Sequence, residues 1–473
     1  MSSLSALNSL LSGSNSADAI DLSAILQAAT GASTPGIDVT SAVNAAVTAA
    51  EAPENTWQSQ ETTLANQTSA LKQIQSDSTN LDNDMQALNN ITGPLSSVTA
   101  TSSNSNVLTA SAVSGSTTGN NVVVVNSLAS TASYASSVAA TASTDLPAET
   151  ITITPSGGTA TTITTGSGVN TLTDLENSIN SANLGVSASI VNDATGSRLA
   201  IVSNTSGSTG NFTVSSSGGS FGFTAGATGT NASLTVNGIA ITSASNTVTG
   251  AISGVTLNLL SASPGTQVSL AIAPNVSAVS SAISQFVGDY NTLIGDLNSE
   301  FADSGSGQGV LAQDAAVQTL QSDLLSAVDY TSTAASGSSA TVNSLASLGI
   351  TVNTDGTLAV DNTTLNSALQ NNFSQVQNFF QGTALNGFAN ALDQQLTSFI
   401  NPADGAFTVD LQSIGSENTT LQDDVTNFQN NIITPLKAQL ESEFSSAEIA
   451  LQQLPNQIRD VDAELGINTS TNS

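Results

Sequence analysis

Both ends of this chain carry apolar residues at heptad spacing, and these two segments enclose a long stretch rich in Ser, Thr and Gly. Heptad spacing gathers apolar side chains on one face of an α-helix, and that face must be covered by another helix. We therefore expect the two ends to pair with each other. The middle of the chain then projects from the paired helices as a head, so the domains are nested rather than serial.

The N-terminal heptads begin at Trp57 and end before Gly93-Pro94. One line of apolar residues comprises Trp57, Leu64, Leu71 and Met85, and the second comprises Ile74, Leu81 and Leu88. This pattern predicts a helix of about nine turns. Two arrangements remain open, antiparallel packing within one subunit and pairing between subunits. Trp57 likewise suits either a core position or an interface anchor, because Trp is enriched in binding hot spots.

A second seam lies near the C-terminus and is typical of a coiled coil. Its two lines are Phe444, Leu451, Ile458 and Leu465, and Leu440, Ala447, Leu454 and Val461. Pro455 interrupts this seam. Because proline removes a backbone donor and clashes with the preceding turn, we expect a kink there and no straight helix to residue 466.

Apolar residues alternate with a period of two between about residues 97 and 272, which predicts antiparallel β-structure. Examples are residues 150–153, 233–236 and 267–270. Asn237-Gly238 separates two such runs and predicts a hairpin, because both residues of a type I′ turn need positive φ. One helix, residues 172–183, is expected within this region. Helical spacing returns from Val276 onward.

These patterns predict an α+β multidomain fold, in which a helical bundle or coiled coil formed by both termini carries inserted antiparallel β-rich head domains. The expected parts are a mobile leader (1–35), an N-terminal helical leg segment (36–95), the first part of a β domain (96–145), an outer β-rich head domain with one helix (146–245), the return of the β domain (246–275), a helical bundle domain (276–435), and a C-terminal coiled-coil leg and tail (436–473).

Charge and composition exclude several classes of function. The chain has 35 acidic and 4 basic residues, a net charge of −31, and neither Cys nor His. Nucleic acids and anionic membrane surfaces are excluded as partners because too few Lys and Arg residues are present to neutralise phosphates. Thiol and imidazole chemistry is absent, so we expect no enzyme activity, no metal and no cofactor. The N-terminus lacks a basic n-region, and no stretch is long enough to cross a bilayer.

Acidic residues at short spacing are interpreted as structural. Residues 353–361 place oxygen ligands close together but lack the closing Glu of a calcium loop, so a β-turn is favoured over a metal site. Asp82 with Asp84, and Asp423 with Asp424, are expected on solvated helix faces. Since few carboxylates can be ion-paired, we also expect acid to remove little stability from the native state.

Several segments, taken in order, resemble the family of the flagellar filament cap, hook-associated protein 2. They are the opening Pro35-Gly36-Ile37-Asp38-Val39, residues 172–190, which are similar to the Ile-Asn motif of flagellin and hook proteins, and then residues 198–203, 246–257, 286–291 and 344–361, followed by the C-terminal heptads. The sequence departs from the family in its scarcity of Lys and Arg, its long Ser/Ala leader and Pro455. With four cations, contacts between subunits must be mainly apolar.

The resemblance implies a secreted, non-enzymatic homo-oligomeric ring of about five or six copies at the distal tip of the bacterial flagellar filament. There it would promote the folding and polymerisation of flagellin and prevent monomer leakage. Flagellin, hook–filament junction proteins and a cytoplasmic export chaperone on the C-terminal helix are the implied partners. Interface candidates are Trp57, Leu64, Leu71, Leu440, Phe444, Leu451, Leu454, Ile458, Val461 and Leu465.

Two other functions remain as alternatives. A cell-surface adhesin would use the Ser/Thr-rich head to bind host or environmental glycans, but it needs no heptads at both ends. A filament subunit would follow the flagellin pattern at its ends rather than the opening at residues 36–39. The observed ends therefore favour the cap.

Overall fold

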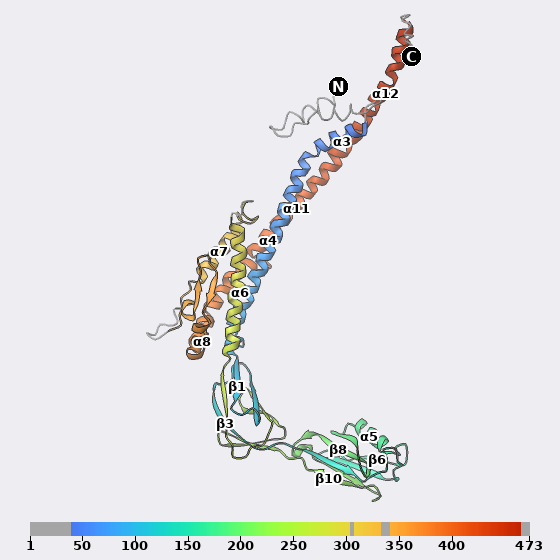
Figure 1. Ribbon diagram of the computed structural model, residues 1–473, viewed down its shortest axis with the longest axis vertical. Helices are drawn as coiled ribbons and strands as arrows, with labels where there is room; N and C mark the ends of the chain where they lie inside the picture. Colours follow the sequence, from blue (N-terminus) through green and yellow to red (C-terminus); the bar gives the residue numbers. More distant parts are fainter. Residues whose placement is uncertain (1–38, 303–306, 333–340, 465–473) are drawn as a thin grey trace.

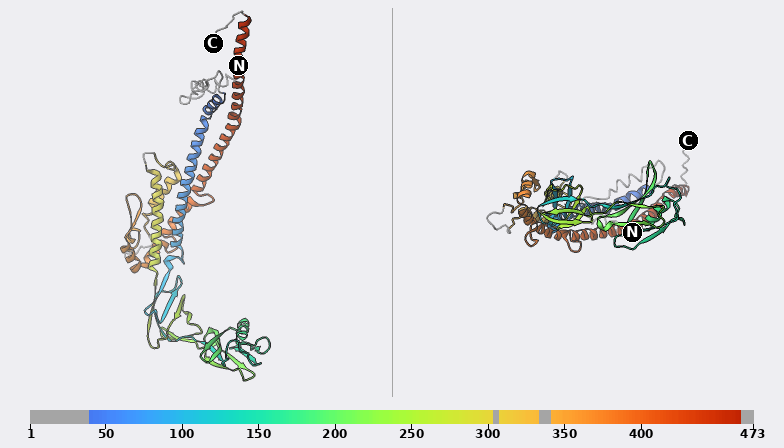
Figure 2. Two further views of the ribbon diagram at one scale, coloured as in Figure 1. Left: turned by 45° about the vertical axis from the view of Figure 1, so that its right-hand side comes forward. Right: turned by 90° about the horizontal axis from the view of Figure 1, so that it is seen from below.

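The computed structural model describes residues 39–302, 307–332 and 341–464. They form a long helical leg that continues into two β domains, the second of which extends sideways from the first (Figure 1). The helices of the N-terminal and C-terminal segments lie side by side along the leg in both views (Figures 1 and 2). The predicted α+β fold with paired ends is therefore confirmed. The expected leader, residues 1–35, lies outside the described residues.

The leg is built around α4 (Ala52–Asn89), which follows the shorter α3 (Val39–Ala50). On the C-terminal side, α11 (Ala406–Phe428) continues through a π-helical turn, η4 (Gln429–Ile433), into α12 (Thr434–Glu464). Helix α4 packs against α11, and α3 packs against α12. The N-terminal heptad helix thus packs against helices of its own subunit, as in the first of the two arrangements that its sequence left open.

A layer of shorter helices covers the lower part of α4. Its elements are α6 (Val276–Phe301), α7 (Ala315–Ala327), α8 (Asn362–Asn371), α9 (Phe373–Gln381), α10 (Phe388–Ile400), the 3₁₀ turns η1 (Pro94–Ser96) and η3 (Ala346–Leu348), and the hairpin β16 (Ile350–Val352) with β17 (Leu358–Val360). Met85 and both heptad lines from Leu64 to Leu88 are buried in this part of the leg. The rings of Phe379 and Phe388 stack here with centroids 5.5 Å apart.

The inner β domain joins strands from both sides of the head. A five-stranded sheet has the order β1 (Val98–Ser102), β15 (Val268–Pro274), β3 (Gly119–Ser127), β11 (Ala232–Val236) and β12 (Ile239–Ser243). A three-stranded sheet has the order β13 (Thr247–Ile252), β14 (Val255–Leu259) and β2 (Leu108–Ala112). Val98 pairs with Pro274, so the chain enters and leaves the head on neighbouring strands. Asn237 (φ 50°) and Gly238 (φ 82°) form the predicted hairpin between β11 and β12.

The outer head has its own core of apolar residues between Ala132 and Phe223. One sheet has the order β10 (Phe223–Ala227), β4 (Thr131–Ser136), β8 (Gly196–Ser206) and β7 (Val186–Asp193). The other has the order β6 (Thr161–Thr164), β5 (Thr150–Pro155) and β9 (Phe212–Ser216), and η2 (Ser208–Gly210) lies before β9. The predicted helix is present as α5 (Leu172–Ser181), and its first turn is closed by a capping box between Thr171 and Asp174.

This core differs from the expected outer head, residues 146–245, at both ends. Strand β4 lies in the outer sheet although it precedes residue 146, and β11 with β12 lies in the inner sheet although both precede residue 246. The physical reason is that alternating apolar residues predict that a strand exists but do not identify the strand with which it pairs.

Helix α12 continues through Pro455, from Thr434 to Glu464, and the kink expected at this residue stays a prediction. An irregular turn lies upstream, at η4, where the backbone widens for five residues. A π-bulge of this kind adds a residue to a helix and shifts its faces.

Candidate functional site

The upper end of the leg is closed by a small apolar cluster between α3 and α12. Val43, Val47 and Ile433 are buried there, and Leu440 and Phe444 pack against them. The first turns of the C-terminal seam are therefore covered by the N-terminal segment of the same chain. These two interface candidates lie inside the subunit.

Trp57 holds the next contact along the leg. Its ring meets Phe428 of α11 edge to face, with centroids 5.2 Å apart and planes at 90°. Gln429 donates a hydrogen bond to Glu54 on the same turn of α4. Trp57 is half-buried, whereas Leu64 and Leu71 are buried, so the three N-terminal candidates stabilise the leg from within.

Within the described residues, the second half of the C-terminal seam is uncovered. Leu451, Leu454, Ile458 and Val461 are between 44% and 53% exposed. Their spacing of three and four residues places them on one face of α12. Figure 2 shows that the end of α12 projects past α3. We call these four residues the open seam. Leu465 lies outside the described residues.

An exposed apolar row of this kind is the usual mark of a helix that packs against a partner. The sequence identified its members from their period, but it also placed Leu440 and Phe444 in the same group. Only the structure shows that, among the described residues, α3 covers Leu440 and Phe444.

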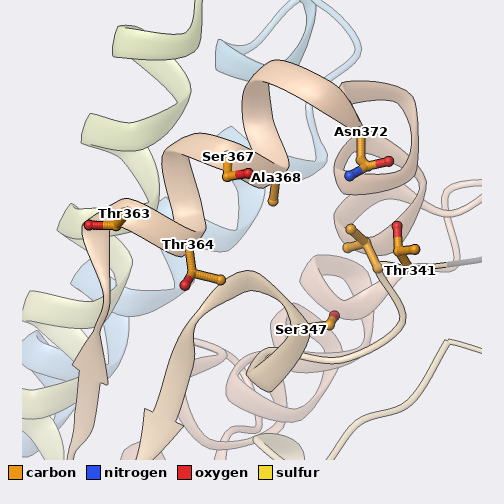
Figure 3. A pocket seen from close by; sticks show the side chains of 8 residues that line it. Thr341, Ser347, Thr363, Thr364, Ser367, Ala368 and Asn372 are labelled. Atoms are coloured by element: carbon orange, nitrogen blue, oxygen red, sulfur yellow. The ribbon is translucent and has the colours of Figure 1, made fainter.

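The hollow beside α8 carries no catalytic arrangement. A depression of about 340 Å³ lies where the start of α8 meets the segment around Thr341 (Figure 3). Thr363, Thr364, Ser367 and Asn372 are among its lining residues, and none of the eight lining side chains titrates. Over the described ranges, no group of His, Cys, Asp or Glu is placed to hold a metal ion, and no helix is long and apolar enough to span a membrane.

The loop that resembled a calcium site is a turn, as its lack of a closing Glu indicated. Asp355 accepts hydrogen bonds from the backbone N–H of Thr357 at 3.0 Å and from its hydroxyl at 2.6 Å. These bonds, that from the hydroxyl first, lower the pKa of the Asp355 carboxyl. Asp361 caps α8 by accepting from Thr363 N–H at 2.9 Å. Both carboxylates thus accept hydrogen bonds within local structure.

The expectation that Asp82 and Asp84 lie on a solvated face is wrong. Asp82 is buried, and Oδ2 of Asp84 is shielded from solvent without a hydrogen-bond donor. Burial, followed by the nearby Asp393, raises the pKa of Asp82 to about 7. Burial, followed by Asp289, raises the pKa of Asp84 to about 7. The sequence favoured a solvated face because acidic side chains are usually exposed. It does not show that α6 and α10 cover this face of α4.

The comparisons with known proteins agree with this architecture. Sequence models of flagellar hook-associated protein 2 match the chain twice, the N-terminus over residues 35–132 and the C-terminus over residues 229–456. The two matches together cover more than half of the chain and leave out most of the outer head. No curated protein matches the chain.

Solved structures of similar proteins are flagellar caps. The chain resembles the D1-D2-D3 domains of the flagellar cap protein FliD from Escherichia coli, with 27% identity and a TM-score of 0.56, over 73% of this chain and 99% of that chain. FliD (HAP2) from Pseudomonas aeruginosa has 26% identity and a TM-score of 0.36, over 41% of this chain and 97% of that chain.

Replacement of Phe428 by Ala tests the upper contact of the leg. Trp57 is the only tryptophan of the sequence, so its fluorescence reports this site alone. We expect Phe428→Ala to shift the emission to longer wavelength and to lower the free energy of unfolding by about 0.5–1.5 kcal/mol beyond the loss of buried area. Phe223→Ala in the outer head is the control and should leave the emission unchanged. An unshifted spectrum in Phe428→Ala would contradict the contact.

Proposed function

Because this chain belongs to the family of flagellar hook-associated protein 2, the flagellar cap protein, we propose that its open seam joins it to other subunits at the distal tip of the filament. The cap function itself follows from membership of the family. The proposal adds which surface of this chain serves assembly. The observation that carries it is the row of Leu451, Leu454, Ile458 and Val461, which is apolar, exposed and without cover in the described part of the chain.

Apolar contact is the type of attachment that this chain can make most readily. It has four cationic side chains against 35 acidic ones, so copies of it repel one another at long range. Burial of half-exposed Leu, Ile and Val side chains offsets that repulsion by roughly 25 cal/mol for each Å² of apolar surface removed from water. We infer that identical subunits associate through the open seam as a ring of about five or six copies.

The same surface suits the other proposed partners at different stages. Before export it is the segment that a cytoplasmic chaperone would cover, because an exposed apolar helix face in an acidic chain invites aggregation. After secretion it would contact flagellin or the hook–filament junction proteins at the filament end. Its role is to bind surfaces, and we propose no bond chemistry for it.

We propose three working parts for the described chain: a leg of α3, α4 and the helices from α6 to α12, an inner plate formed by the sheets of β1 and β13, and an outer head from β4 to β10. The head and the plate would cover the growing end while the leg reaches along it. We do not propose glycan binding, because the depression at Thr141, Ser143 and Thr173 has no aromatic side chain among its lining residues on which a sugar ring could stack. The comparisons do not favour the adhesin alternative.

The location is tested by immunogold electron microscopy of intact cells with an antibody against the outer head. A cap should be labelled only at the tip of each filament, because only the end of the polymer exposes its binding surface. Labelling along the filament would identify a filament subunit instead. Labelling over the cell envelope would support an adhesin and overturn the proposed site of action.

The role of the open seam is tested by replacing all four of its residues with Ser. We expect the variant Leu451→Ser/Leu454→Ser/Ile458→Ser/Val461→Ser to remain folded but to lose its oligomers, because the apolar area that holds them is removed. Light scattering coupled to size-exclusion chromatography measures the mass. Ile239→Ser, at a position 70% exposed on β12, is the control and should keep the mass of the parent protein. Unchanged oligomers in the fourfold variant would exclude the seam as the interface.

A further inference from the structure

Three pairs of aspartates lie where α4 packs against its neighbouring helices. Asp77 faces Asp296 and Asp84 faces Asp289, both on α6. Asp82 faces Asp393 on α10. The two pairs with α6 are seven residues apart on each helix. From the first pair to the second, the residue number rises from 77 to 84 on α4 and falls from 296 to 289 on α6. They therefore repeat at the heptad period of an antiparallel helix pair.

Two of these six aspartates, Asp77 and Asp82, are buried, and the other four are half-buried. Asp77 is 6% exposed and Asp82 is 5% exposed. Oδ1 of Asp82 and Oδ2 of Asp84 are buried and receive no hydrogen bond from any donor group. Two adjacent buried carboxylates that are both ionised would repel each other strongly, and a shared proton removes this repulsion and supplies the missing donor.

No cation offsets the charge of these pairs. Neither α6, α9, α10 nor α11 contains a Lys or Arg, and Lys72 is the only cationic residue of α4. Lys72 is exposed and forms no ion pair, and the single ion pair of the described chain joins Arg198 to Asp193 in the outer head. The other charged groups that face the pairs or their helices are also acidic: Glu300 beside Asp296, and Asp314 beside Asp410 of α11.

One member of each pair is held as a hydrogen-bond acceptor by a glutamine on its own helix. Gln73 donates to Asp77 at 2.9 Å, Gln86 to Asp82 at 2.7 Å, and Gln285 to Asp289 at 3.0 Å. The glutamine-bonded carboxylate is thereby oriented, and the two members of each pair can share one proton.

We propose that the three carboxyl pairs bind protons when the leg folds, so that α4 closes against α6 and α10 most firmly in mildly acidic medium and is loosened as the pH rises. The inference concerns the leg alone and does not rest on the proposed function. According to this proposal, the packing of α4 against α6 and α10 depends on pH. This contact lies in the part of the leg that precedes β1 in the chain.

The direction of the pH effect follows from linkage. The carboxyls of Asp82 and Asp84 have pKa values raised from 3.8 to about 7, and that of Asp296 is raised by burial and Asp77. A raised carboxyl pKa contributes stability that is fully present below pH 3.8 and is lost as the pH rises through 7. Each proton that the folded state binds and the unfolded state does not raises the unfolding constant about tenfold for each pH unit between pH 3.8 and about 7.

Carboxylates held by local hydrogen bonds act in a lower range and do not obscure this effect. The pKa of Asp174 is lowered first by the Thr171 hydroxyl, and that of Glu149 first by the Ser216 hydroxyl. The stability that such groups contribute is present above their ordinary pKa values, 3.8 and 4.5, and is lost only as the pH falls further. Burial, followed by Asp314, also raises the pKa of Asp410 on α11, but both triple variants described below keep this residue.

The test compares two triple variants of the full chain. Asp82→Asn/Asp84→Asn/Asp296→Asn replaces with asparagine, in each pair, the aspartate whose carboxyl pKa is raised, and the asparagine amide can donate a permanent hydrogen bond to the remaining carboxylate. Asp404→Asn/Asp423→Asn/Asp424→Asn removes the same charge from exposed positions. Urea unfolding at pH 5, 6, 7 and 8 is measured for both variants and for the parent protein.

We expect the unfolding constant of the parent to rise about tenfold or more per pH unit between pH 5 and 6.5. The pair variant should lose most of this slope and should exceed the parent in stability at pH 8, whereas the exposed variant should keep the parent's slope. Equal slopes in all three proteins would overturn the proposal.

A second measurement does not depend on folding of the variants. Infrared difference spectra of the parent between pH 5 and pH 8 should show the carbonyl stretch of protonated carboxyl groups, which ionised aspartates lack, persisting to near neutral pH. Absence of that band at pH 6 would also overturn the proposal. If addition of Ca²⁺ at pH 8 raised stability while the band was absent, the pairs would bind a divalent cation instead of protons.

Discussion

Everything in this molecule depends on the packing of α4 against the helices that follow the head in sequence. The apolar seam of α4 is buried by helices that follow the two β domains in sequence. Its burial therefore requires the chain to return from the head to the leg. Because β1 and β15 pair at the entrance of the head, the return is fixed in space by main-chain hydrogen bonds. The long leg and the plate are therefore held in one arrangement by contacts of high sequence separation.

The same packing explains why the two heptad segments have different fates. The N-terminal seam meets α6, α10 and α11 and is buried along most of its length. Within the described residues, α3 covers the C-terminal seam as far as Phe444. The apolar side chains beyond it are exposed, and in a chain with a net charge of −31 we propose that they form the main attractive surface for association.

Much of this was predictable from the sequence because periodicity reports directly on local structure. The long helix, the hairpin at Asn237-Gly238, the helix at Leu172 and the pairing of the ends were all predicted and are confirmed. The wrong predictions concern which strand or side chain packs against a given residue. Strands β11 and β12 pair inside the inner sheet, and the aspartates at 82 and 84 face other carboxyl groups. None of these is set by local pattern, although the position of Asp77 and Asp84 three residues after Ile74 and Leu81 was a signal that both face the seam.

The central claim is that the two ends of one subunit pair with each other and leave the open seam for other copies. Since the chain has no cysteine, spin labels can be attached to cysteines introduced at the exposed positions Asn44 of α3 and Glu441 of α12. Pulsed electron paramagnetic resonance then measures the distance between labels in doubly labelled protein, before and after it is unfolded and refolded with excess unlabelled protein. The account predicts one short distance that survives this dilution. Loss of that distance on dilution would show that the ends pair between subunits and would contradict the account.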